Sequence, residues 1–245
     1  MPEDPSAFET KVDDPRMALS IGPLSSKRDG LPLRCVGKWA YDKIFHLYQY
    51  FGIFTNDMKS KWSGLNYVEI CSGPGRCVFK ETAEEVDGTA LAILQHNAFD
   101  MVGAALFMDN DQNTVDILRK RIDLLELGGK ARAEVSDYTD TSGLRALLRS
   151  LPAGCLNLVL VDPTDCGIPL AAIRVIRDTL RRADLIITVA DKMDAGRNLA
   201  RAITGPGFAA ARDKYSAFLD DNSFFEHPDH LSWRQPDTEQ SRRAS

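Results

Sequence analysis

Acidic residues recur along this chain where predicted strands end, the positions at which an open parallel sheet binds its ligands. Glu69 closes the first such strand and Asp109 the second, Asp137 follows the third, and Asp162 follows the most apolar one. A carboxylate at such a strand end can accept hydrogen bonds from ribose hydroxyls. Each acid alone is more typical of a helix cap or a loop, but their recurrence at successive strand ends indicates one shared binding crevice.

A glycine turn follows Glu69. Its residues are Cys71, Ser72, Gly73, Pro74 and Gly75. The glycines allow the backbone to bend sharply and to approach a ligand closely, although such turns also occur for steric reasons alone. We expect the turn to lead directly into a helix. The two cysteines at its borders, Cys71 and Cys77, are interpreted as small packing residues, since a nucleophilic role would require a nearby base.

The segment Asp162-Pro-Thr-Asp165 follows the most apolar strand. At this position Asp162 could be a polar acceptor at a reaction centre, with Pro163 stiffening the turn. Equally, Asp162 could cap the helix expected to begin near Pro169, or only start a turn. Both interpretations remain open.

Alternating strands and helices are expected to position these residues. The predicted strands are 66–70, 104–108, 131–135, 156–161 and 184–189. The predicted helices are 39–61, 111–127, 141–150, 169–182, 194–203 and 208–219. This pattern is typical of a Rossmann-like α/β fold, an open and mostly parallel sheet with helices on both faces, and the first strand is expected at its centre. The interval between Gly75 and Asp109 exceeds the roughly 20 residues of a simple β-α-β unit, which predicts an insertion.

Composition divides the chain into three parts. Residues 1–33 are rich in Pro, Asp, Ser and Gly and predict a mobile arm. Residues 34–220 predict one α/β domain that begins with a helical segment, and residues 221–245 an irregular tail. After Val189 no alternating apolar run is long enough for a paired strand, so one edge of the sheet is expected to be uncovered and open to a partner chain.

The overall composition restricts partners and compartment. The 245 residues carry a net charge of −5, which argues against a general nucleic-acid binder. The five cysteines form no C-x-x-C pair, which argues against a zinc site or a disulfide framework and for a reducing compartment. No metal site is expected, and Glu226-His-Pro-Asp-His230 is interpreted as a polar tail. Without a long apolar run or a signal-peptide pattern, a cytoplasmic protein with no membrane association is predicted.

From about residue 36 to about residue 225 the chain resembles the three-Cys-motif partner protein family, within the class I S-adenosylmethionine methyltransferases. The resemblance is carried by an ordered series of motifs: Val36-Gly-Lys-Trp-Ala-Tyr-Asp-Lys43, Tyr67-Val-Glu-Ile-Cys-Ser-Gly-Pro-Gly-Arg76, Phe107-Met-Asp-Asn-Asp111, Leu118-Arg-Lys-Arg121, Val161-Asp-Pro163 and Arg197-Asn-Leu199. The glycine turn is similar to the first methyltransferase motif, with Cys71 in place of the usual first small residue.

The resemblance implies S-adenosylmethionine as the cofactor and a three-cysteine protein as a partner. It assigns to the cofactor the residues Lys43, Glu69, Cys71, Ser72, Gly73, Pro74, Gly75, Asp109 and Asp137. Of these, Asp109 would take the ribose hydroxyls, Asp137 the adenine amine and Lys43 the carboxylate, with a solvated lysine as the alternative for Lys43. The resemblance assigns the catalytic-strand position to Asp162 and Pro163.

Three functions are compatible with these residues. The first is a methyltransferase-like enzyme that binds S-adenosylmethionine and acts on an unspecified acceptor. Enzymes that methylate exocyclic base amines usually carry a proline and an aromatic residue where Thr164 and Asp165 stand, which argues against that acceptor class. The second function is a non-catalytic partner protein that retains the fold. An NAD-type oxidoreductase is the least favoured, because Val78 occupies the third glycine position and would crowd helix–strand packing.

Overall fold

Five parallel strands form the central sheet of the protein, whose computed structural model describes residues 24–204 and 209–228. They are β2 (Leu65–Ile70), β5 (Ala104–Asp109), β6 (Ala131–Val135), β7 (Leu156–Val161) and β8 (Ala183–Ile187). Their spatial order is β6-β5-β2-β7-β8, and every neighbouring pair is parallel. The five predicted strands and the Rossmann-like α/β fold are confirmed, with the first predicted strand at the centre of the sheet.

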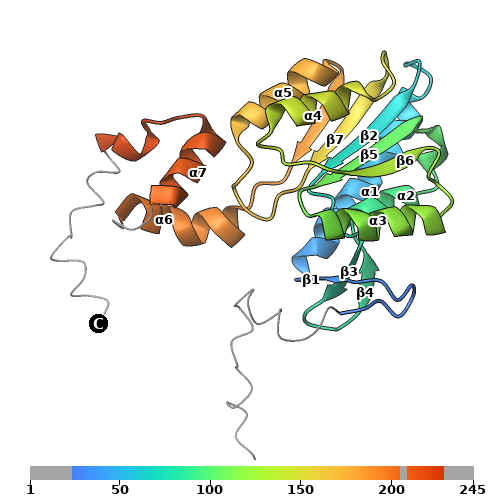
Figure 1. Ribbon diagram of the computed structural model, residues 1–245, viewed down its shortest axis with the longest axis horizontal. Helices are drawn as coiled ribbons and strands as arrows, with labels where there is room; N and C mark the ends of the chain where they lie inside the picture. The colour runs from blue at the N-terminus through green and yellow to red at the C-terminus, as the bar shows by residue number, and fades with distance from the viewer. Residues whose placement is uncertain (1–23, 205–208, 229–245) are drawn as a thin grey trace, which may run out of the picture.

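Helices cover both faces of this sheet (Figure 1). One face carries α1 (Trp39–Met58), α2 (Thr89–Leu94) and α3 (Gln112–Leu124), and the other carries α4 (Thr141–Arg149) and α5 (Leu170–Leu180). Successive side chains of a strand point to opposite faces, so Tyr67 packs in the α1 core while Val68 packs in the α4–α5 core. β2 and β7 are buried along their whole length, which explains the apolar run that predicted β7.

The segment after the glycine turn differs from the prediction, because no helix follows the turn directly. The chain continues as β3 (Arg76–Phe79), turns back as the antiparallel β4 (Glu85–Asp87), and enters α2 only at Thr89. β3 also pairs in parallel with β1 (Arg34–Val36), which gives a small sheet of order β1-β3-β4. The predicted insertion is therefore this hairpin with α2 and the short helix η2 (Phe99–Met101).

Residues 24–33, which lie in the predicted mobile arm, are bonded to the domain. The Asp29 carboxylate accepts from Arg76 Nη1 and from Arg121 Nε, both at 2.9 Å. The Arg121 side chain is only 2 % exposed and also donates to the Pro74 carbonyl oxygen at 2.6 Å. These contacts hold the segment against the glycine turn. Residues 1–23 of the predicted arm lie outside the described residues.

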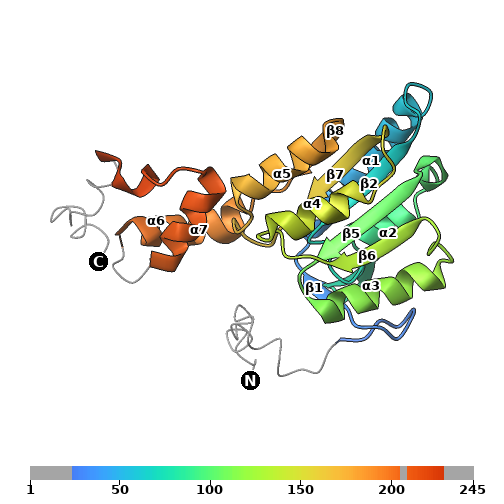
Figure 2. The ribbon, with the colours of Figure 1, turned by 45° about the horizontal axis from the view of Figure 1, so that its top comes forward.

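Beyond β8 the described chain is helical. It forms a π-helix, η3 (Asp191–Ala195), then α6 (Gly196–Thr204), α7 (Ala209–Leu219) and the short η4 (Phe224–Glu226). The helices predicted from about 194 and 208 are confirmed, and α6 and α7 lie beyond the carboxyl ends of the strands (Figure 2). The described residues after Ile187 contain no strand, so within them β8 is an edge of the sheet. The end of the predicted tail, 229–245, lies outside the described residues.

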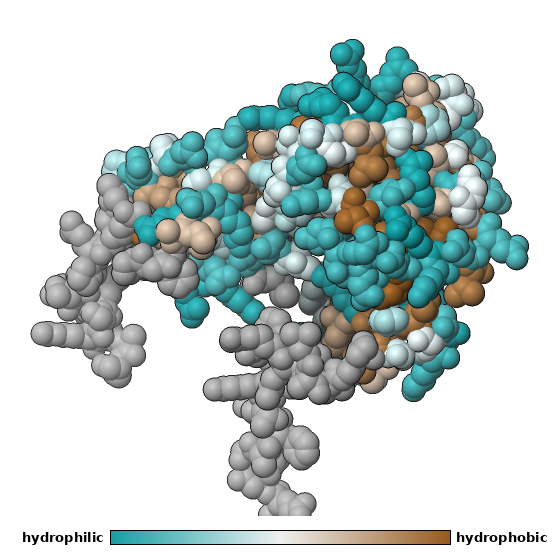
Figure 3. Space-filling model, viewed as in Figure 1, coloured by the Kyte–Doolittle hydropathy of each residue, from teal (hydrophilic) through white to brown (hydrophobic). Residues whose placement is uncertain are grey.

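Within residues 24–204 and 209–228, no helix has the length and apolar character needed to cross a bilayer. The face of the molecule seen in Figure 1 is largely hydrophilic, with smaller apolar areas between the helices (Figure 3).

Asp29→Asn should lower the free energy of unfolding by about 3 kcal/mol, because it leaves the buried guanidinium of Arg121 without its counter-charge, whereas Arg76 keeps Asp87 as a partner. Urea unfolding followed by circular dichroism measures this change. The matched control is Asp116→Asn. The Asp116 carboxylate pairs with Arg119 on the exposed surface of α3, so its removal should lower the free energy of unfolding by less than about 1 kcal/mol. Equal unfolding midpoints for the two variants would contradict the structural role of Asp29.

Candidate functional site

The glycine turn, Asp109 and Asp162 meet at the carboxyl edge of the central sheet. Parallel pairing brings the ends of β2, β5 and β7 to the same edge. The contacts are direct, since Gly73 N–H donates to Asp109 Oδ2 at 3.0 Å and Asp162 N–H donates to the Ile70 carbonyl oxygen at 3.1 Å. The structure therefore brings these predicted residues together.

Asp109 is oriented by the backbone around it. Its Oδ2 atom accepts from Gly73, and its Oδ1 atom accepts from the Asp111 N–H at 3.2 Å. The side chain lines a cavity of about 380 Å³, here called the Asp109 cavity. Its other lining residues are Pro32, Leu33, Arg34, Pro74, Asn113, Thr114 and Ile117. Each carboxylate oxygen retains a lone pair, so Asp109 can accept further hydrogen bonds from a ligand in this cavity.

The turn itself has backbone angles that favour glycine. Gly73 and Gly75 have φ of 64° and 92°, and Cys71 has φ of 65° without being glycine. A Cβ atom on Gly75 would lie 2.9 Å from Leu118 Cδ1, so packing as well as φ requires glycine there. Burial and the nearby carboxylate of Asp109 raise the pKa of the Cys71 thiol to about 12, so the thiol stays protonated and is a packing residue.

Glu69 lies in the core of the domain. It is 0 % exposed, with Oε2 accepting from the Tyr67 hydroxyl at 2.8 Å and Oε1 accepting from the Thr89 hydroxyl. Burial raises the pKa of Glu69 from an ordinary 4.5 to about 8, against the opposing effect of these hydrogen bonds. The structure therefore places this predicted cofactor residue beneath the turn, where its carboxyl group fastens β2 to α2.

Lys43 and Asp162 form an ion pair across the site. Lys43 Nζ on α1 contacts Asp162 Oδ2, with side chains 24 % and 11 % exposed, and Nζ also lies 5.3 Å from the centre of the Trp39 ring. Lys43 is therefore not a solvated lysine. Asp162 does not cap the next helix either, because the residue before α5 is Pro169 and makes no side-chain cap. Pro163, which follows Asp162, is buried.

Asp137 lies at the end of β6 and is exposed. Its Oδ1 atom accepts from the backbone and the hydroxyl of Thr139 at 2.8 and 2.7 Å, which is an ordinary turn contact. The next residue, Tyr138, is half-buried, and burial together with Cys71 and Asp165 raises its pKa to about 12. The Tyr138 hydroxyl lies near the loop that follows Asp162, 3.1 Å from the place that a Cβ atom on Gly167 would occupy.

Arg34 is a site residue that the sequence analysis did not identify. It lies on β1 and lines the Asp109 cavity, with Nη1 3.4 Å from the place that a Cβ atom on Gly73 would occupy. No ion pair joins Arg34 to a carboxylate among residues 24–204 and 209–228. Its position depends on the pairing of β1 with β3, and neither strand was predicted. The only feature of the sequence that could have indicated Arg34 is that a basic residue stands shortly before the helix predicted at 39–61.

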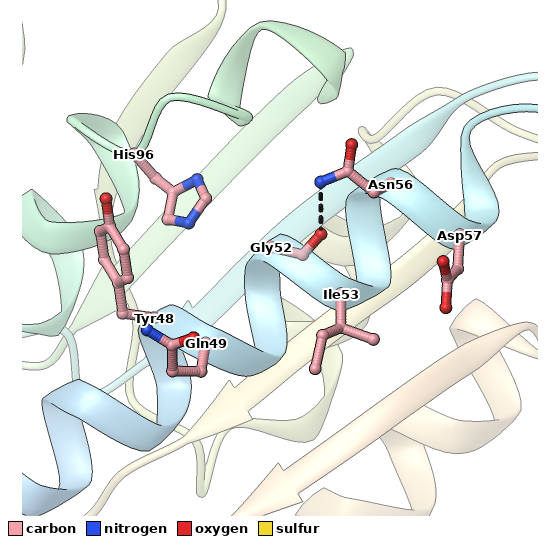
Figure 4. A pocket seen from close by; sticks show the side chains of 7 residues that line it. All are labelled: Tyr48, Gln49, Gly52, Ile53, Asn56, Asp57 and His96. Atoms are coloured by element: carbon pink, nitrogen blue, oxygen red, sulfur yellow. Dashed lines mark hydrogen bonds between the residues drawn. The ribbon is translucent and has the colours of Figure 1, made fainter.

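A second cavity of about 380 Å³ lies beside α1 and contains none of the predicted site residues (Figure 4). Its lining residues are Tyr48, Gln49, Gly52, Ile53, Asn56, Asp57 and His96. The His96 ring packs 4.1 Å from the Tyr48 ring, and its Nδ1 atom accepts from the Ala98 N–H at 2.9 Å. Burial lowers the pKa of His96, so this histidine is a neutral packing residue. The described residues hold no group of three or more His, Cys, Asp or Glu side chains that could bind a metal.

The comparisons with known proteins find similarity in structure. No protein-family model and no curated protein sequence matches the chain. One similar structure is an S-adenosylmethionine-dependent methyltransferase from Clostridium acetobutylicum, at 11 % identity and a TM-score of 0.35 over 59 % of this chain and 50 % of that one. Another is the MycE methyltransferase of the mycinamycin biosynthetic pathway, in complex with Mg, SAH and mycinamycin VI, at 15 % identity and a TM-score of 0.36. That match covers 71 % of this chain and 44 % of MycE, so the chain spans about half the length of these two proteins or less.

The raised pKa of Glu69 predicts that the unfolding free energy falls as pH rises from 4.5 to about 8. In this window the folded state retains a proton that the unfolded chain has released, so raising the pH favours unfolding. Glu69→Gln carries no titrating group and should lose less stability over the same window. Chemical unfolding at a series of pH values measures both profiles, and parallel profiles would show that Glu69 has the same pKa in the folded and the unfolded chain.

Proposed function

We propose that this chain binds S-adenosylmethionine at the carboxyl edge of its sheet and is a methyltransferase-like protein. The observation that carries the proposal is the hydrogen bond between Gly73 N–H and Asp109, which holds the glycine turn and the strand-end acid together beside the Asp109 cavity. At about 380 Å³, this cavity falls within the range of roughly 300–1,000 Å³ for small-molecule sites.

The polar groups around the turn fit such a cofactor. Asp109 has free lone pairs for ribose hydroxyls, and Asp137 lies on the neighbouring strand end, where the resemblance assigns the adenine amine. The Ser72 hydroxyl is buried in the turn and has no hydrogen-bond partner among the described residues, so a ligand group can satisfy it. The backbone of Gly73, Pro74 and Gly75 completes the methionine side of the site.

Two cations are candidates for the cofactor's carboxylate. Lys43 is paired with Asp162 and would have to leave it in order to contact a ligand. Arg34 lines the cavity directly and faces Gly73, so it is the better placed of the two. A guanidinium also matches a carboxylate with two parallel hydrogen bonds.

S-adenosylmethionine supplies an electrophilic methyl group when bound. The chain would contribute mainly by proximity and orientation: Asp109 and Arg34 hold the ligand at two ends, and Pro163 stiffens the loop on the acceptor side. The Lys43–Asp162 ion pair fixes the Asp162 side chain at the end of β7. This pair would align an acceptor group by hydrogen bonding.

Within this class, the motifs favour the three-Cys-motif partner family, with a three-cysteine protein as the partner. A non-catalytic partner protein is the second candidate function. The observation that supports it is the free edge of the sheet at β8, where no strand of the described chain pairs with the outer backbone groups. Such an edge can accept a strand from another protein. Methyl-group turnover in the presence of the partner separates the two candidates.

Asp109→Asn should weaken binding of S-adenosylhomocysteine by about tenfold or more, since one charge-assisted hydrogen bond contributes about 1.5–3 kcal/mol. Asparagine retains an oxygen for the Gly73 N–H, so the fold should survive the change. Calorimetric titration measures the affinity, with Asp116→Asn on the surface of α3 as the control. Wild-type affinity in Asp109→Asn, or no binding by the wild-type protein at millimolar ligand, would refute the proposed site.

Arg34→Gln should weaken S-adenosylhomocysteine binding by about tenfold while leaving the binding of 5′-methylthioadenosine unchanged, because only the first ligand carries a carboxylate. The same titrations on Lys38→Gln, a change of an exposed lysine before α1, provide the control. Equal losses for both ligands would mean that Arg34 shapes the cavity without binding the carboxylate.

A further inference from the structure

One buried carboxylate joins the C-terminal helices to the loop after β7. Asp194 lies in the π-helix η3 and is 4 % exposed. Its Oδ2 atom accepts from the Cys166 N–H at 2.8 Å and from Lys214 Nζ at 2.5 Å. Its Oδ1 atom accepts from Asn198 Nδ2 at 2.8 Å and from the Tyr215 hydroxyl at 3.0 Å. Asp194 therefore connects α6, α7 and the 162–168 loop.

The irregular helix turns Asp194 inward. Ala195 N–H donates to the Ala190 carbonyl oxygen five residues earlier, at 3.1 Å, which widens the helix at this point. Burial opposes ionisation of Asp194, but the hydrogen bonds from Lys214 and Asn198 outweigh burial and hold its pKa at about 2. The carboxylate is thus charged at all ordinary pH values, and its contacts are charge-assisted.

The loop packs into the core of the C-terminal helices. Cys166 is 2 % exposed and belongs to a cluster with Ala202, Ile203, Tyr215 and Phe225, separate from the two cores that flank the sheet. Lys214 adds a longer contact to Asp165 Oδ2 at 3.4 Å. Two residues after Cys166, Ile168 returns to the core of α4 and α5. The loop is therefore held at one end by the sheet and in the middle by α6 and α7.

We propose that Asp194 is a positioning residue, which fixes the loop carrying Asp162 and Pro163 to the α6–α7 helix pair so that the acceptor side of the site forms only when these helices are docked. The inference rests on the proposed function for the meaning of Asp162. The mechanical part, that Asp194 holds the loop, is independent of any ligand.

Hydrogen exchange of the full chain, read by mass spectrometry, tests this coupling. Asp194→Asn should speed exchange in the 163–168 segment by about tenfold, the factor expected for the loss of one charge-assisted hydrogen bond, and leave β2 unchanged. The matched control is Asp213→Asn, which removes the same charge from an exposed neighbour on α7 and should exchange as wild type. Tyr215→Phe, which removes one hydroxyl and keeps the ring, should give a smaller increase confined to the same segment.

Two further measurements separate positioning from general stability. Lys214→Arg should retain wild-type exchange in the loop, whereas Lys214→Met should match Asp194→Asn. With S-adenosylhomocysteine added, the loop should gain protection in wild type and Asp213→Asn but not in Asp194→Asn, while the glycine turn gains protection in all three. Equal acceleration in β2 and the loop, or no acceleration in either, would overturn the proposal. Absence of ligand protection at the wild-type turn would instead count against the proposed function, leaving the ligand-free result valid.

Discussion

The buried guanidinium of Arg121 holds the glycine turn and the segment that covers it in one arrangement. From α3 it donates to Asp29, to the Pro74 carbonyl oxygen of the turn, and to the carbonyl oxygens of Leu31 and Pro32. A buried charge is tolerated only when it is paired and fully hydrogen-bonded, so Arg121 and Asp29 require each other. The wall of the Asp109 cavity, including Arg34, depends on this pair.

Around the turn, two acidic side chains face two basic ones, and Glu69 does not add a third negative charge. With a pKa of about 8, Glu69 is mostly protonated at neutral pH and acts as a core residue. Asp109 and Asp162 then face Arg34 and Lys43, but only Lys43 and Asp162 are joined in an ion pair. Asp109 and Arg34 line the same cavity with opposite charges, an arrangement suited to a ligand that carries both hydroxyl donors and a carboxylate.

The sequence was sufficient for features that depend on local burial. The apolar runs of β2 and β7 and the helical spacing of α1 reflect which residues face the core, so those elements were predicted. Strand order then brought Asp109 and Asp162 to one edge. The helix expected after Gly75 was wrong because β3 is stabilised by pairing with β1, a distant partner that leaves no local signal. The burial of Glu69, the Lys43–Asp162 pair and the place of Arg34 depend on packing between elements, which spacing does not encode.

Residues 29–36, which include β1, are synthesised before every element that they contact. Asp29 pairs with Arg121, which lies 92 positions later in the chain. Contacts of such long sequence separation close late in folding, because the loop entropy must be overcome first. The pairing of β2 with β7 at the centre of the sheet, which joins Leu65 to Leu156, spans a similar separation. The cavity beside Asp109 is therefore closed, like the centre of the sheet, by contacts between distant parts of the chain.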